Sequence, residues 1–269
     1  MWTTIYEYAC FFLIYAFLGW CTEVVYAAVT SGEFVNRGFL NGPVCPIYGF
    51  GVVGVVFILS PVSHLLFVLY AASVLLTSLL EYITGYVLEK LFQSKWWDYT
   101  DKPFNIKGYV CLSFSLLWGF GAVFIVRLLH PTISWVIGTL PQFIGLPIMA
   151  IGYIIILIDL IVTVKSVNGL NTKLSQLEKV TERINDLSVE IGENLSKNTL
   201  ALMEKNEEMR EKFEEKREEF ENLVNKQREL LSGLKPSQKR LVRAFPKLKN
   251  PKFSASIQKL KTAIKDSAK

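Results

Sequence analysis

Residues 65–90 read LLFVLYAASVLLTSLLEYITGYVLEK, and this stretch decides the fold. Its first sixteen residues carry no charge, and about 20 apolar residues in a helix are enough to cross the hydrocarbon core of a bilayer. Stretches of the same character lie at residues 5–29, 47–63, 109–129 and 142–164. The sequence therefore predicts an all-α integral membrane protein with about five transmembrane helices in residues 1–165.

The composition changes along the chain of 269 residues, whose mean hydropathy of +0.32 is unusual for a soluble protein. Residues 1–164 hold six Lys/Arg and eight Asp/Glu, a net charge of −2, whereas residues 165–269 hold 23 and 16, a net charge of +7. This split excludes a single soluble domain, a disordered chain and a collagen-like chain. It predicts a transmembrane domain (1–165), a cytoplasmic helical arm (166–234) and a largely flexible basic tail (235–269).

The loops between the apolar stretches predict the orientation, because Lys and Arg concentrate on the cytoplasmic side of a membrane. If the N-terminus is outside, the basic residues of loops 30–46 and 91–108 face the cytoplasm, as does the arm, and only Arg127 lies near the outer surface. We therefore expect a multi-pass protein of the cell membrane with its N-terminus outside and its C-terminus in the cytoplasm.

The arm carries apolar residues at steps of three or four, which is the pattern of a helix that packs against another helix. These residues are Leu170, Leu174, Leu177, Val180, Ile184, Leu187 and Ile191. The pattern predicts a long coiled-coil-like helix that self-associates or binds a partner helix through residues 170–234. The alternative is a lone charged helix stabilised by ion pairs between residues four apart.

The tail has eleven Lys/Arg and one acid over residues 235–269, and residues 254–268 fit a short amphipathic helix. Basic segments on the cytoplasmic side are attracted to anionic lipid headgroups, so we expect contact with anionic lipid. A simply solvated tail is the alternative. Nucleic acid is a weaker candidate, because the segment contains no recognisable nucleic-acid-binding module.

Two glutamates, Glu23 and Glu81, lie inside apolar stretches. A charged group in a membrane helix costs at least about 2.5 kcal/mol unless it is paired or hydrated, so both are candidates for a functional site. The alternative is that they lie near enough to the interface to reach water. Asp159, which lies shortly before Lys165, is expected to extend to the cytoplasmic surface.

The loop at residues 31–49 is rich in Gly and Pro and cannot form a continuous helix. Irregular backbone at membrane depth survives only where protein or a water-filled cavity surrounds it. We therefore predict a re-entrant-like cytoplasmic loop that carries Arg37 and Asn41 towards the glutamates, with Arg37 approaching Glu23, Glu81 or both.

A second loop, residues 96–105, is aromatic and acidic, and an interfacial belt is its alternative interpretation. The strings GPVC (42–45) and GYVC (108–111) each follow a loop and open an apolar stretch. They suggest an internal repeat that includes Cys45 and Cys111, although two apolar stretches can also resemble each other by chance.

No P-loop, H-E-x-x-H or G-x-S-x-G motif is present. The sequence therefore indicates no recognised catalytic chemistry, and we expect no cofactor. The two histidines, His64 and His130, are a weak case for a metal site, so none is expected. Energy for transport would have to come from a partner or an ion gradient.

Five strings occur in order along residues 5–165: FLGWCTEVVY, NRGFLNGPVCPIYGFG, LLEYITGYVLEKLF, WWDYTDKPFNIKGYVCLSFSLLWGFG and LLHPTI. In these strings the chain resembles the bacterial family catalogued as ABC-transporter type IV permeases. The resemblance implies several membrane helices and a separate ATPase subunit as partner. It also implies which positions line a pocket, and these are Glu23, Asn36, Arg37, Asn41, Cys45, Tyr48, Glu81, Trp97, Asp98, Asn105, Cys111 and Trp118.

Three functions remain open at this point. The leading one is the permease-like membrane subunit of a transporter, with a polar site built from loop 31–49, Glu23 and Glu81. The second is a membrane-anchored scaffold or interaction protein that acts through its arm. The third and weakest is an intramembrane enzyme that uses Glu23, Glu81 or Asp98 as acid or base.

Overall fold

The computed structural model describes residues 2–197 and 207–266. The chain separates into two compact units. Unit 1 consists of Met1–Val167 and Arg240–Lys249, and unit 2 consists of Asn168–Lys239 and Asn250–Lys269. The basic tail (235–269) is therefore divided between the two units.

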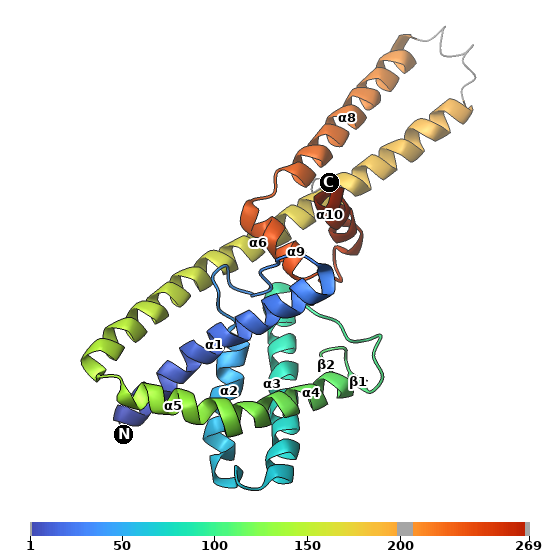
Figure 1. Ribbon diagram of the computed structural model, residues 1–269. Coiled ribbons are helices and arrows are strands. Elements are labelled where there is room, and N and C mark those ends of the chain that lie inside the picture. The colour runs from blue at the N-terminus through green and yellow to red at the C-terminus, as the bar shows by residue number, and fades with distance from the viewer. Residues whose placement is uncertain (1, 198–206, 267–269) are drawn as a thin grey trace. The chain divides into compact units, whose positions relative to one another are not determined.

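Unit 1 is a bundle of helices with one small antiparallel hairpin of strands (Figure 1). A 3-10 turn at Ser60–Val62 follows the second helix, and a π-helical stretch at Ile125–Leu129 joins the fourth to the fifth. The elements of this part of the chain are α1 (Trp2–Ser31), α2 (Pro46–Leu59), α3 (Leu66–Phe92), β1 (Asn105–Ile106), β2 (Val110–Cys111), α4 (Leu112–Phe124), α5 (His130–Thr139) and α6 (Gln142–Lys197), which continues into unit 2.

Among the described residues, four helices are long and apolar enough to cross a membrane: Thr4–Ser31, Leu66–Phe92, Leu112–Thr139 and Gln142–Gly192. The expectation of an all-α membrane protein is therefore confirmed. The segment Pro46–Val62 is apolar but shorter. The irregular loop before it extends to Cys45, so α2 begins only at Pro46. That this segment also crosses, which would make five spans, stays a prediction.

The apolar helix Leu112–Thr139 extends beyond the predicted stretch 109–129, since it continues through His130 and Pro131 to Thr139. Proline has no backbone N–H and normally interrupts a helix. Here Pro131 lies at the start of α5, directly after the π-helical stretch, where the hydrogen-bond pattern already changes. The helix can therefore pass the proline without a break in its path.

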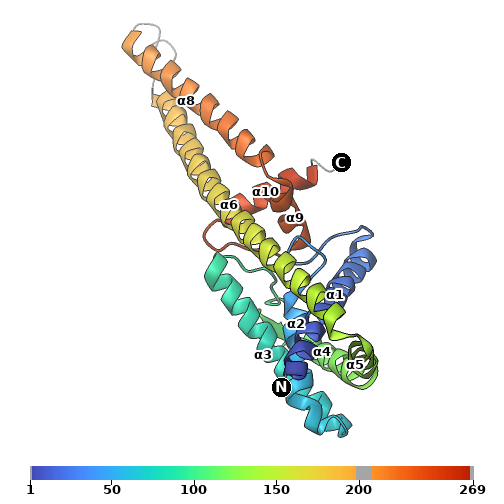
Figure 2. The ribbon, with the colours of Figure 1, turned by 90° about the vertical axis from the view of Figure 1, so that its left-hand side faces the viewer.

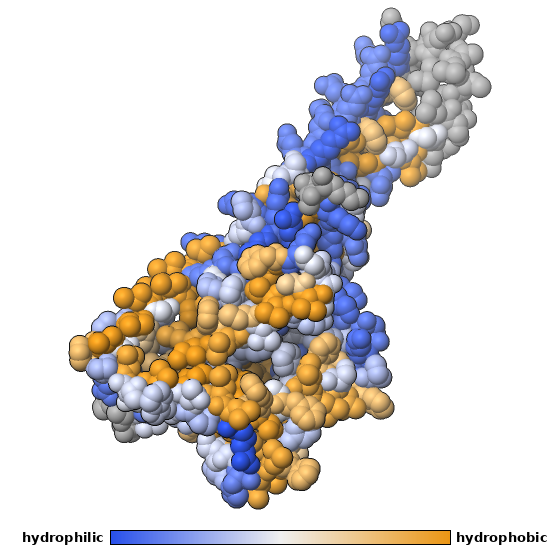
Figure 3. Space-filling view, in the orientation of Figure 1, coloured by the Kyte–Doolittle hydropathy of each residue, from blue (hydrophilic) through white to orange (hydrophobic). Residues whose placement is uncertain are grey.

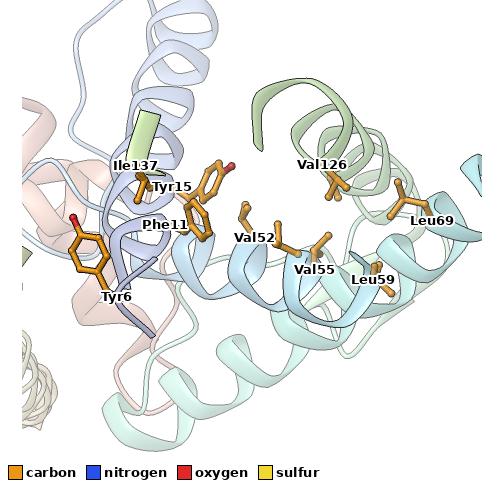
Figure 4. Packing of buried hydrophobic residues seen from close by; sticks show 11 residues of the cluster. Tyr6, Phe11, Tyr15, Val52, Val55, Leu59, Leu69, Val126 and Ile137 are labelled. Carbon is orange, nitrogen blue, oxygen red and sulfur yellow. The ribbon is translucent and has the colours of Figure 1, made fainter. Parts of the chain in front are cut away.

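The core of unit 1 lies around α2, which packs against α1 on one side and α3 on the other. Tyr15, Val55 and Leu69 are almost completely buried there, and Figure 4 shows Phe11 and Tyr15 of α1 directed towards Val52 of α2. The outer faces of the helices are apolar as well: Phe67 is 86% exposed and Phe143 is 76% exposed. Figure 3 shows this apolar surface in orange, and it is the surface that helices in contact with lipid chains require.

In unit 2, α8 (Glu207–Ser232) runs alongside the second half of α6 (Figure 1 and Figure 2). Arg183 and Glu219 form an ion pair at 2.9 Å, and Lys216 lies 2.5 Å from Glu190. As α6 proceeds, its partners come from earlier positions in α8, so the two helices are antiparallel. The segment 198–206, which belongs to the predicted 170–234 arm, lies outside the described residues.

The apolar seam predicted for the arm is buried inside unit 2. Leu174, Leu177 and Leu187 are each at most 1% exposed. Within the same unit, Thr181 of α6 accepts a hydrogen bond from Gln227 of α8, and Glu178 of α6 accepts one from Ser256 of α10 (Ser254–Asp266). The notable residues of α10 are Ile257, Leu260 and Ile264, which are also buried. A coiled coil in the strict sense and self-association through this arm stay predictions.

The basic tail, expected to be largely flexible, contains α9 (Pro236–Ala244) as well as α10. Residues 254–268 were expected to form a short amphipathic helix, and α10 occupies Ser254–Asp266. Leu241 in α9 and Leu248 between the two helices are at most 2% exposed. Burial of these apolar side chains gives the tail a reason to fold that its charge alone does not reveal.

Candidate functional site

Glu23, on the last third of α1, is the centre of a first polar cluster. The Tyr48 hydroxyl donates a hydrogen bond of 2.6 Å to Glu23 Oε1, and Arg37 Nε lies 3.4 Å from Oε2. The Arg37 guanidinium also lies 5.1 Å from the centre of the Tyr26 ring. Its Nε–H is close enough for an ion pair but is not aligned for a hydrogen bond. The structure thus brings together Arg37 and Glu23, as expected from the loop.

Close packing of α1 against α2 makes this contact possible. A Cβ atom added at Gly19 would lie only 2.2 Å from Cγ of Tyr48. This distance is too short for two carbon atoms that are not bonded, so a side chain at position 19 would clash. Glycine therefore lets the Tyr48 ring pass across α1, four residues before Glu23, and direct its hydroxyl at the carboxylate.

Glu81, on α3, is the centre of a second cluster and is only 8% exposed. The Tyr99 hydroxyl donates to Glu81 Oε1 at 3.2 Å, while Oε2 has no hydrogen-bond partner among the described residues. Trp118 lies close to the same carboxylate, and its ring meets the Tyr48 ring edge-on at 5.6 Å. The two clusters are therefore connected through aromatic side chains. The hydrogen-bond donor to Glu81 is Tyr99, whereas Arg37 pairs with Glu23.

Asn36 and Asn41 organise the irregular loop between α1 and α2. Asn36 Oδ1 accepts hydrogen bonds from Trp20 Nε1 at 2.8 Å and from the backbone N–H of Gly38 at 3.1 Å. Its Nδ2 donates to the carbonyl of Asn41 at 2.7 Å. These bonds replace the helical pattern that the Gly- and Pro-rich sequence cannot form.

Asp159 of α6 binds the same loop, although it was expected to extend to the surface. Its carboxylate accepts from the backbone N–H of Asn41 at 3.1 Å, from that of Gly42 at 2.7 Å and from Asn41 Nδ2 at 2.8 Å. An acid in an apolar helix was a visible signal in the sequence. Its partner was not, because the two lie 118 residues apart.

The second loop is organised around Asp98, which is 6% exposed. Lys249 Nζ lies 2.5 Å from Oδ2, and Lys95 Nζ lies 3.1 Å from Oδ1. Burial acts to raise the pKa of Asp98, but the hydrogen bonds from Lys249, Thr100 and Lys95 outweigh it and hold the pKa well below its usual range. Asp98 is therefore a charged anchor for this loop.

Trp97 and Asn105 serve the shape of the second loop. Trp97 Nε1 donates to the carbonyl of Tyr109 at 2.8 Å. Asn105 Nδ2 donates to the carbonyl of Lys102 at 2.8 Å, and its Oδ1 accepts from the N–H of Gly108 at 3.1 Å. Both side chains are thus tied to backbone groups of the β1–β2 hairpin.

Cys45 and Cys111 occupy equivalent places, each at the residue that precedes a helix, and both are buried. The Cys45 N–H donates to the carbonyl of Ala16 at 2.9 Å, and Cys111 Sγ lies 3.4 Å from Ser113 Oγ. Across residues 2–197 and 207–266, no group of three or more His, Cys, Asp or Glu side chains is placed to hold a metal ion.

Two further residues of the site were not expected from the sequence, namely Tyr99 and Arg240. The guanidinium of Arg240 lies against the loop after α1 and donates to the carbonyl of Gly38 at 2.7 Å. In the sequence Arg240 is one of eleven basic residues in the tail, and nothing distinguishes it from the others.

The arrangement places the carboxylates of Glu23, Glu81 and Asp159, the guanidinium groups of Arg37 and Arg240, and several aromatic rings within the apolar helices and the loop that covers them. Such a set can hold a cation or exchange a proton, since one oxygen of Glu81 is free of partners among the described residues. No nucleophile activated by a neighbouring base is present among these contacts.

The profile of one protein family matches residues 10–164, which run from α1 into α6 and include both glutamates and both loops. No curated protein matches the chain. No solved structure matches it either. Because the match covers more than half of the chain, and its motifs are the ones that form the two clusters, the chain belongs to the family described as "Putative ABC-transporter type IV".

Proposed function

We propose that this chain is the membrane-spanning, permease-like subunit of a transporter, with a polar site formed by loop 31–49, Glu23 and Glu81. The observation that carries the proposal is the continuous series of contacts from Glu23 through Tyr48 and Trp118 to Glu81. A carboxylate in an apolar helix costs free energy, so its presence there points to a functional site. Glu23 accepts from the Tyr48 hydroxyl and is paired with Arg37, whereas Glu81 accepts from the Tyr99 hydroxyl. One oxygen of Glu81 has no partner among the described residues, which leaves this carboxylate free to respond to a ligand.

The orientation that fits this function has the N-terminus outside and five crossings, with Pro46–Val62 as the short one. In that arrangement the loops 32–45 and 93–111 lie on the cytoplasmic side, where an ATPase subunit would bind. Both loops contain networks of polar contacts, which supports their placement at an aqueous surface. The chain has no P-loop of its own, so the ATPase has to be a separate protein.

The test is to purify the full chain from native membranes and measure ATP hydrolysis by the complex that accompanies it. We expect an ATPase subunit to co-purify. Glu81→Gln should lower the hydrolysis rate, because it removes the charge of the buried carboxylate while keeping its size. Glu33→Gln is the matched control, since Glu33 is an exposed acid of the first loop.

A complex without any ATPase, or a Glu81→Gln complex as active as the Glu33→Gln complex, would contradict the permease proposal. The antiparallel α6–α8 hairpin favours a second candidate, a membrane-anchored interaction protein. This candidate predicts that a protein without nucleotide hydrolysis co-purifies with the chain. Substitutions on the exposed faces of the hairpin should abolish that co-purification.

A further inference from the structure

Residues 240–249, which we call the docking segment, fold onto both loops of unit 1. At its start, the Arg240 guanidinium donates to the carbonyls of Gly38 at 2.7 Å and Phe39 at 3.0 Å. It also donates to Asn41 Oδ1 at 3.2 Å and to the carbonyl of Asn36 at 3.4 Å. One side chain from the tail thus binds four acceptors in the loop that carries Arg37.

Arginine suits this position for a physical reason. The loop has no regular secondary structure at residues 34–38, so its carbonyls need partners from elsewhere. A guanidinium offers five N–H donors in a fixed plane, whereas an ammonium offers three around one point. The Asp159 carboxylate accepts from the backbone N–H groups of Asn41 and Gly42 in the same loop, so the loop is bonded both to Arg240 and to Asp159.

The other end of the docking segment binds the second loop. Lys95 and Lys249 exchange two backbone hydrogen bonds, of 2.7 and 2.9 Å, as a short antiparallel bridge. Lys249 Nζ reaches Asp98 at 2.5 Å, and Lys247 Nζ lies 3.1 Å from Asp101.

An apolar contact lies between the two polar ends. The Phe245 ring meets the Trp96 ring edge-on at 4.9 Å, and Trp96 is only 3% exposed. A basic and aromatic segment therefore fits an acidic and aromatic loop. The charged pairs lie at the Lys247–Lys249 end, whereas Arg240 at the other end donates to uncharged acceptors.

We propose that the docking segment is a latch that closes the polar site, by holding the loop at residues 36–42 against the bundle. The latch regulates the site described above and so rests on the proposed function. Arg240 binds the residues on either side of Arg37, and Arg37 forms the ion pair with Glu23. Release of the latch frees the loop, withdraws Arg37 from Glu23 and opens the way to Tyr48.

Cys45 provides a natural reporter for the latch. It ends the same loop that Arg240 binds, and it is 5% exposed. A closed latch keeps its thiol covered, and an open latch exposes it to a water-soluble maleimide. This readout needs no knowledge of a substrate.

The experiment uses the full chain with Cys10, Cys21 and Cys111 replaced by alanine, and measures the rate of maleimide reaction at Cys45. Arg240→Ala should raise the rate on the order of ten-fold or more, because hydrogen bonds from a charged donor are the strong ones. Arg243→Ala is the matched control, since Arg243 is an exposed arginine of the same helix.

A charge exchange provides a second variant that keeps the proposal testable if Arg240→Ala fails to fold. Lys247→Asp places a negative charge against Asp101 and should raise the rate about two- to five-fold, the effect of an exposed pair. Adding Asp101→Lys restores opposite charges and should return the rate to that of the parent.

An unchanged rate in a folded Arg240→Ala protein, or an equal rise in Arg243→Ala, would overturn the latch, and so would a charge exchange that fails to restore the rate. The proposed function fails separately, since a Glu81→Gln complex with normal ATP hydrolysis contradicts the permease while the Cys45 rates still report the latch.

Discussion

Replacing Asp159 by alanine should loosen the loop at residues 36–44 while leaving the helices of unit 1 intact. The carboxylate is the acceptor for the backbone N–H groups of Asn41 and Gly42 and for the Asn41 side chain. Alanine offers no acceptor, so all three donors lose their partner. The helix itself should not suffer, because alanine is the strongest helix former.

The size of the effect follows from these contacts. A hydrogen bond to a charged group contributes about 1.5–3 kcal/mol, but Asp159 is only half-buried, so water can replace part of each bond. We therefore take the lower end of that range for each backbone amide. Since about 1.4 kcal/mol is a factor of ten, each amide should open on the order of ten times more often.

Hydrogen exchange of the full-length protein measures this opening directly. The amides of Asn41 and Gly42 should exchange about ten-fold faster in Asp159→Ala, and Asp159→Asn should fall between, because an amide retains one acceptor oxygen but no charge. Asp186→Ala, at an exposed acid of the same helix, should leave the loop unchanged. Unaltered exchange at Asn41 and Gly42 in Asp159→Ala would refute the role given to this carboxylate.

Three further predictions concern packing, pH and orientation. Gly19→Ala should lower the melting temperature, because its Cβ would overlap Tyr48, whereas Gly54→Ala, which meets no atom within 4 Å, should be neutral or slightly stabilising; equal melting temperatures would contradict this. Asp98 has a lowered pKa, so its contribution to docking is present above the ordinary carboxyl pKa of about 3.9 and is lost only as the pH falls through the lower pKa of the folded state. Hydrogen-exchange protection of the amides around Asp98, corrected for intrinsic exchange rates, should therefore stay constant from pH 8 to 5. A loss of protection centred near pH 6 would argue against the pairing. In the proposed orientation and a background without native cysteines, Ser63→Cys should react with an impermeant reagent on intact cells and Glu33→Cys should not; the opposite pattern would place the N-terminus inside.

The features that the sequence could predict are those with a local pattern. Apolar runs predicted the helices of unit 1, since length and hydropathy are sufficient to identify a span. The contact between Arg37 and Glu23 could be predicted because Arg37 is the only basic residue in the loop next to that helix. The seam of the arm was visible from its spacing, and its leucines are buried.

The features that it could not predict join residues far apart in the chain. Asp159 and Asn41 are 118 residues apart, and Arg240 and Gly38 are 202 apart, and no periodicity links such pairs. The partner of the arm could not be foreseen either, because a seam shows that a helix packs but not that α8 of the same chain packs against it. Arg37 was expected to approach Glu23, Glu81 or both; it lies beside Glu23, and a hydroxyl from Tyr99 binds Glu81.

The family match ends at residue 164, while the carbonyls of the first loop are bound by Arg240, far beyond it. Residues inside the family match and residues beyond it therefore belong to one set of hydrogen bonds. A relative built only from the matched region would have to leave the carbonyls of Gly38 and Phe39 to water or to another chain. Loss of residues 240–249 would therefore remove the Arg240 donor from the carbonyls of Gly38 and Phe39 while every residue of the family match stayed in the chain.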